Sequence, residues 1–180
     1  FARFLKMDQY EVVLVESEDI GTVGVGEATI PLIQIFNNTL KIDENDFLKK
    51  TYGTFKLGIE FVNWGRIGDR YTHAFGGVGH DLESLPFYHY WLKLYHQGKS
   101  DDLGDYCMNT LAGRQCKFMR SINAGNSPLS SIAYAFHFDA GLYAKYLRAY
   151  SEERGVNRIE GKINRVELND ESGYLKAVHL

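Results

Sequence analysis

The chain has 180 residues, of which 20 are lysine or arginine and 23 are aspartate or glutamate, so its formal net charge is −3. Because no basic block or stripe accompanies this balance, it argues against nucleic acid as a partner. Hydrophobic residues make up 44% of the chain and charged residues 24%, proportions that are typical of a globular protein and exclude a disordered one. No apolar run reaches the roughly 18 residues of a membrane span, and no secretory leader is recognisable, so we expect a cytoplasmic protein.

The cysteines and histidines predict no metal centre. Cys107 and Cys116 fit neither a disulfide framework nor a Cys-x-x-Cys site, and we expect both to be reduced thiols. None of the six histidines has metal-ligand spacing with a carboxylate or a cysteine.

The first informative element is a predicted strand, Tyr10–Val15, which follows a predicted helix end at Phe1–Lys6 and leads directly into Glu16. A β-rich run that ends in an acidic residue is typical of the second strand of a dinucleotide-binding βαβ unit, in which the carboxylate binds ribose hydroxyls. An exposed strand-end carboxylate fits the same pattern. Because no Gly-x-Gly-x-x-Gly turn precedes the strand, we expect the first strand and its phosphate-binding turn to be absent from this sequence.

A glycine-rich segment, Gly24–Pro31, comes next and reads GVGEATIP. Its glycines would let main chain approach a neighbouring group closely, where a Cβ atom would intrude, and a plain turn that leads into a helix fits the same glycines. A helix is predicted to start near Pro31, with Ile33, Phe36 and Leu40 on one face.

The segment Phe55–Val62 alternates like a single strand, with Lys56, Gly58 and Glu60 on one face. A lysine on the polar face of a strand is usually solvated. Here the neighbours are aromatic, Gly58 leaves room, and Glu60 is a candidate ion-pair partner, all of which favour a lysine with a function.

Further elements are predicted from capping residues, apolar spacing and turn residues. They are a helix after the N-cap Asp43 that ends before Gly53, a helix at Pro86–Tyr95, a helix after the N-cap Asp139 that ends before Gly155, and two strands, Val166–Leu168 and Tyr174–Leu180, around the turn Asn169–Gly173.

Several of these runs together resemble the flavin-dependent tryptophan halogenases. They are GVGEATIP at 24–31, IEFVNW at 59–64, YTHAFG at 71–76, HYWL at 89–92 and FHFDA at 136–140, the last two resembling packing signatures of that family. The resemblance implies an α/β fold, namely part of a Rossmann-like FAD-binding domain of the flavin monooxygenase type. The resemblance also implies that this domain has inserted helical and strand segments on the substrate side and a C-terminal β-ribbon. Residues 1–180 would be one continuous piece of a single such domain, inactive alone because later substrate and halide contacts are absent.

The same resemblance implies which residues carry the chemistry. Reduced FAD, dioxygen and chloride or bromide would yield hypohalous acid, and the catalytic Lys56 would direct it onto the substrate. His73 and Phe75 would sandwich an indole, with tryptophan as the leading candidate, although a lone loop histidine is more often a surface residue. A separate flavin reductase would supply the reduced FAD, and a homodimer is an open expectation. Flavin contacts are implied at Glu16, Ser17, Ile20, Val25, Gly26, Ala28 and Ile163.

Two other functions stay open at this point. The first is an FAD-dependent aromatic hydroxylase, which shares the dinucleotide fold and the β-ribbon but needs no lysine distant from the flavin. The second is a non-catalytic protein that binds flavin or an indole. Lys56 in its aromatic strand is the feature that separates the halogenase from the hydroxylase, and halide-dependent product formed by the full-length protein with a flavin reductase would separate all three.

Overall fold

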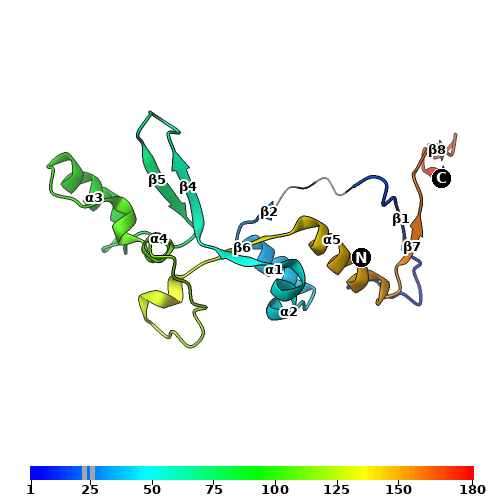
Figure 1. Cartoon of the computed structure of the whole chain (residues 1–180), viewed down its shortest axis with the longest axis horizontal. Coiled ribbons are helices and arrows are strands. Elements are labelled where there is room, and N and C mark those ends of the chain that lie inside the picture. Colours follow the sequence, from blue (N-terminus) through cyan, green and yellow to red (C-terminus); the bar gives the residue numbers. More distant parts are fainter. Residues whose placement is uncertain (22–23, 25–26) are drawn as a thin grey trace. The chain divides into compact units, whose positions relative to one another are not determined.

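The computed structural model describes residues 1–21, 24 and 27–180, with Glu27 described by its main chain (Figure 1). The chain divides into two compact units. The first unit comprises Phe1–Glu27, Leu40–Gly53 and Phe138–Leu180, and the second comprises Ala28–Thr39 and Thr54–His137.

The first unit contains a parallel strand pair. Strand β1 (Val13–Glu16) pairs with β7 (Asn157–Glu160), with Glu16 opposite Glu160. The predicted strand is confirmed but starts at Val13 and not at Tyr10, whose amide donates to the Lys6 carbonyl in a turn (3.0 Å). The predicted helix end at Phe1–Lys6 is wrong, because these residues form hydrogen-bonded turns and a single turn is a poor helix nucleus.

Two helices of this unit begin at the predicted caps. Helix α2 (Glu44–Thr51) starts after Asp43, whose Oδ1 accepts from the Asp46 amide at 2.8 Å. Helix α5 (Ala140–Glu152) starts after Asp139, whose Oδ1 accepts from the Leu142 amide at 2.8 Å. In each case a carboxylate satisfies a first-turn N–H group that has no partner within the helix.

Helix α2 ends at a left-handed residue that is a tyrosine and not a glycine. Tyr52 takes the left-handed conformation (φ 51°), and the Gly53 amide donates to the Leu48 carbonyl (2.9 Å). A Cβ at position 53 would lie 2.6 Å from Leu48 Cδ2, so the Leu48 side chain would have to shift to admit a larger residue there.

The core of the first unit is aromatic. Phe47 of α2 is fully buried and meets the rings of Phe138 and Tyr143 edge-on, each at a centroid distance of 5.4 Å. The Tyr146 hydroxyl of α5 also donates to Asp46 Oδ2 at 2.9 Å, so helices α2 and α5 are joined by both apolar and polar contacts.

Replacing Asp139 with alanine should lower the free energy of unfolding by about 1 kcal/mol, because the Leu142 amide loses its acceptor. Asp139→Asn keeps a side-chain oxygen and serves as the control, with a smaller expected loss. Denaturant unfolding followed by circular dichroism measures the difference. An unchanged midpoint for Asp139→Ala would show that the cap adds no stability.

The predicted C-terminal β-ribbon is confirmed. Strand β8 (Arg165–Leu168) pairs antiparallel with β9 (Leu175–His179). In the turn between them, Asn169 Oδ1 accepts from the amides of Glu171 and Ser172 at 3.0 and 2.9 Å, as asparagine commonly does in turns.

A sheet whose residues, except Glu27 and Phe138, belong to the second unit has β6 (Ala135–Phe138) between β2 (Glu27–Ala28) and β3 (Thr54–Lys56). A separate antiparallel pair joins β4 (Gly58–Val62) to β5 (Arg70–Ala74).

The prediction of one strand over Phe55–Val62 is therefore wrong. The chain leaves one sheet after Lys56 and enters another at Gly58, and the Leu57 carbonyl between them accepts from the Phe75 amide at 3.0 Å. Gly58 permits the close approach of β5, because a Cβ there would lie 2.7 Å from the His73 carbonyl oxygen.

The helices of this unit are α1 (Leu32–Thr39), α3 (Phe87–His96) and α4 (Met108–Arg114). Helices α1 and α3 were expected from their spacing, although Leu40 lies beyond the end of α1. Helix α4 and strands β2, β5 and β6 were not expected from the sequence. Short 3₁₀ turns occupy Leu103–Tyr106 and Pro128–Ser131. The described residues thus form a mixed α/β structure, and none of their helices is long and apolar enough to cross a membrane.

Candidate functional site

Lys56 is buried, with 7% of its surface exposed, at the last position of β3. It lies opposite Ala135, which has no exposed surface. The Lys56 Nζ atom donates to the Thr29 carbonyl at 3.0 Å. Since the Thr29 amide and hydroxyl both donate to the Phe136 carbonyl, at 3.0 and 2.9 Å, the acceptor is itself fixed to β6. The amine is therefore held at one place by main chain.

An aromatic ring faces this amine. Lys56 Nζ lies 5.4 Å from the centroid of the Phe75 ring, within the range of a cation–π contact. Phe75 directly follows β5, whose residue His73 lies opposite Ile59 with an exposed side chain. The structure thus brings Lys56 and Phe75 together and places His73 two residues before Phe75.

The expected ion pair between Lys56 and Glu60 is wrong. The two Glu60 oxygens accept from Arg70 Nε and Nη2 at 2.7 and 2.8 Å, across the β4–β5 pair. The break at Leu57 puts Lys56 and Glu60 in different sheets, so alternation along one strand does not apply. The hydrogen bond from Arg70 lowers the pKa of Glu60.

His137 lies near Lys56 on the sheet, although its sequence pattern indicated only packing. Because Thr54 pairs with His137 and Lys56 with Ala135, the lysine and the histidine lie on the same face. Both line a cavity of about 360 Å³, together with Phe118 and other residues. Burial, and then the positive charge of Lys56, lower the pKa of His137, which favours the neutral ring.

Asn109 fixes the junction that follows Lys56, and nothing in the sequence pattern pointed to it. This α4 side chain is 1% exposed, and its Nδ2 atom donates to the carbonyls of Leu57 (3.1 Å) and Ala133 (2.5 Å). Within the described part of the chain its Oδ1 atom is buried without a hydrogen-bond partner. One side chain therefore ties the end of β3 to the segment that enters β6.

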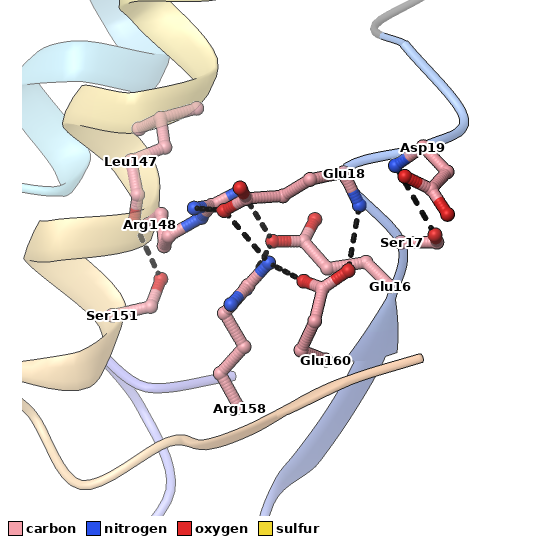
Figure 2. A network of polar contacts seen from close by, with 9 residues as sticks. All are labelled: Glu16, Ser17, Glu18, Asp19, Leu147, Arg148, Ser151, Arg158 and Glu160. Atoms are coloured by element: carbon pink, nitrogen blue, oxygen red, sulfur yellow. Dashed lines mark hydrogen bonds and ion pairs between the residues drawn. The ribbon is translucent and has the colours of Figure 1, made fainter. Parts of the chain in front are cut away.

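Glu16 belongs to a network of ion pairs at the end of β1 (Figure 2). Its Oε1 atom accepts from Arg158 Nε at 2.5 Å and lies 2.9 Å from Arg148 Nη2. The hydrogen bond from Arg158 is the main cause of a lowered Glu16 pKa, and Arg148 adds to it. Glu16 is a charged, half-buried carboxylate and not a freely solvated strand end.

The other predicted flavin contacts are spread over several segments. Ser17 Oγ accepts from the Asp19 amide at 3.2 Å, which shapes the turn after β1. Ile20 and Ile163 are exposed, and Ala28 is exposed in β2. The predictions for Val25 and Gly26 fall outside the described residues.

Other candidate reactive groups are few. Cys107 is buried, Cys116 is exposed, and both are free thiols. Among residues 1–21, 24 and 27–180, no cluster of histidine, cysteine and acidic side chains has the arrangement that a metal ion needs.

Comparison with known proteins shows the family to which this chain belongs. The family model described as tryptophan halogenase matches residues 1–180. The tryptophan 7-halogenase RebH of Lentzea aerocolonigenes is 31% identical over 188 residues, which cover 93% of this chain and 34% of that protein. The 7-chloro-L-tryptophan 6-halogenase KtzR of Kutzneria sp. is also 31% identical, over 95% of this chain and 36% of its own length.

Solved structures agree with the family match. Xcc4156, a flavin-dependent halogenase from Xanthomonas campestris, is 44% identical with a TM-score of 0.89, covering 99% of this chain and 35% of that one. BrvH, a flavin-dependent halogenase from Brevundimonas sp. BAL3, is 38% identical with a TM-score of 0.83. The match covers 93% of this chain and 33% of BrvH. The chain spans about a third of the length of these relatives. With its whole length matched, this chain belongs to the tryptophan halogenase family.

Proposed function

We propose that a protein containing this chain halogenates an aromatic substrate with reduced FAD, dioxygen and chloride or bromide. The observation that carries the proposal is the buried Lys56, whose amine is anchored by the Thr29 carbonyl and faces the ring of Phe75. Tryptophan or another indole is the proposed substrate, because relatives named tryptophan halogenases match over nearly the whole chain.

The proposed FAD-binding site lies at the carboxyl end of β1, in a Rossmann-like FAD-binding domain. Ligands of α/β sheets bind beyond the carboxyl ends of parallel strands, and Glu16 lies at that end of the β1–β7 pair. Among the described residues its Oε2 atom receives none of the arginine contacts, so the residues present fit a ribose that donates hydroxyl hydrogens. When bound, reduced FAD with dioxygen supplies the oxidising power that converts halide to hypohalous acid.

Lys56 is proposed to hold and direct this oxidant. The Thr29 carbonyl takes only one of the ammonium hydrogens, so others remain to donate to hypohalous acid. A fixed cation among buried, aromatic groups stabilises developing negative charge more strongly than an exposed one and limits quenching by water. His73 and Phe75 are proposed to hold the indole ring by stacking.

Halide dependence of the product is the decisive test. A full-length protein containing this chain, given a separate flavin reductase, dioxygen and an indole, should form halogenated product only when chloride or bromide is present. A hydroxylated product formed without halide would instead identify an aromatic hydroxylase. Flavin and indole binding without any product would identify a non-catalytic binding protein.

Replacing Phe75 with alanine should raise the KM for an indole about two- to tenfold from lost stacking of roughly 0.5–1.5 kcal/mol, with a further rise from lost burial. Phe61→Ala is the matched control, because Phe61 stacks on Tyr71 elsewhere in the β4–β5 pair. Steady-state kinetics with several indoles measures both variants. An unchanged KM for Phe75→Ala would place the substrate elsewhere and favour a phenol or a pyrrole.

A further inference from the structure

The carboxylate of Glu16 is bound through one of its two oxygens. Within the described residues, the contacts from Arg158 Nε and Arg148 Nη2 both fall on Oε1, at 2.5 and 2.9 Å. A carboxylate with two arginine contacts on one oxygen has a fixed orientation. Its other oxygen, Oε2, can still accept hydrogen bonds.

The two arginines are themselves fixed from different elements. Arg158 projects from β7, is 13% exposed and also bonds Glu160 through Nη2. Arg148 projects from α5, and its Nη1 atom lies 2.9 Å from Glu18 Oε1. The Glu18 amide donates to Glu160 Oε1 at 2.8 Å, which closes the network over the turn after β1 (Figure 2).

The charge of this cluster favours a neutral ligand with hydroxyl donors. Two guanidinium groups face three carboxylates, from Glu16, Glu18 and Glu160, so one negative charge is in excess. An additional anion such as a phosphorylated ribose would be repelled, whereas ribose hydroxyls can donate to the available carboxylate oxygen.

We propose that Arg158, assisted by Arg148, is a positioning residue that presents Oε2 of Glu16 to the adenosine ribose hydroxyls of FAD. The inference rests on the proposed function of the chain in binding flavin. Neither arginine is expected to touch the ribose. Without Arg158 the carboxylate turns and becomes hydrated, and the contact with the hydroxyls weakens.

The test compares two ligands and four protein forms. Affinity for FAD and for an FAD analogue with 2′,3′-dideoxyadenosine is measured by flavin fluorescence titration of a full-length protein containing this chain. The forms are wild type, Arg158→Met, Glu16→Ala and the double variant. Arg158→Met should weaken FAD binding about tenfold, the loss of one charge-assisted contact, and leave affinity for the analogue within about twofold. In the Glu16→Ala background, Arg158→Met should have no further effect on FAD affinity.

A matched control guards against a general loss of structure. Arg165→Met removes a more exposed arginine that pairs with Glu167 in the β-ribbon, and it should leave both affinities unchanged. If Arg158→Met weakened FAD and the analogue equally, Arg158 would support the fold only and the inference would be overturned.

Two further results separate this inference from the proposed function. If Glu16→Ala bound FAD as tightly as wild type, Glu16 would not be a ribose ligand, and the inference would fail while halogenation could still be observed. If wild type bound no FAD, the proposed function itself would fail, and the inference with it.

Discussion

Replacing Lys56 with alanine should lower the rate of halogenated product formation at least about a hundredfold, the loss typical for a donor that stabilises developing charge, and leave FAD affinity unchanged. The physical reason is that the buried amine, anchored on the Thr29 carbonyl, is the donor proposed to hold hypohalous acid. The proposed contacts to adenosine, Glu16 and Ser17, lie at the end of another strand, so flavin reoxidation should continue. Product chromatography and flavin absorbance, measured on the same samples, report the two quantities.

Two variants sharpen the test at Lys56. Lys56→Arg should also fail, because the planar guanidinium is larger than an ammonium and presents its donors in a different geometry. Lys50→Ala is the control, since Lys50 is exposed and pairs only with Asp46 on the same helix among the described ion pairs. Wild-type halogenation by Lys56→Ala would refute the assigned mechanism. Loss of flavin binding would make the lysine a cofactor ligand and favour the hydroxylase.

Replacing Phe47 with alanine should lower the free energy of unfolding by about 3–5 kcal/mol, the range for large aromatic truncations in cores. Phe47 has no exposed surface and contacts the rings of both Phe138 and Tyr143, so its loss leaves a cavity and removes two edge-on ring contacts. Phe4→Ala is the matched control in the same unit, because Phe4 is 71% exposed, and it should change stability little. Denaturant titration measures both. A loss below about 1 kcal/mol for Phe47→Ala would contradict this account of the core.

The elements that could be predicted from sequence are those specified by local chemistry. Asp43 and Asp139 accept hydrogen bonds from amides three residues along the chain, so the residue type and its spacing suffice to predict a helix start. The β-ribbon follows in the same way from Asn169 and its turn. The helix end predicted at Phe1–Lys6 was wrong, because six residues are too short a pattern to distinguish a helix from a turn.

The other errors arise from strand pairing that the local sequence does not specify. Nothing local indicates that β3 pairs with β6 while β4 pairs with β5, so the change of sheet at Leu57 and the true partner of Glu60 could not be predicted. The closeness of His137 to Lys56 depends on the same pairing.

In the candidate site, too, the features specified by local sequence could be predicted and those that depend on distant residues could not. Its likeness to the family and the acidic end of β1 could be read from the sequence, whereas the arginines around Glu16 could not, because Arg158 lies 142 residues further along the chain. The clamping role of Asn109 likewise depends on bonds to carbonyls 24 and 52 residues away.

The oxygen that anchors Lys56 belongs to the main chain of Thr29, and every residue type carries that oxygen. A mutant library that varies position 29 therefore cannot delete the acceptor by changing a side chain, and the Thr29 amide keeps a main-chain bond to Phe136 as well. A one-residue insertion or deletion just before Thr29 would instead change which carbonyl reaches the amine. For an engineer of this enzyme family, the length of that segment is therefore the quantity to preserve if the anchor of Lys56 is to stay in place.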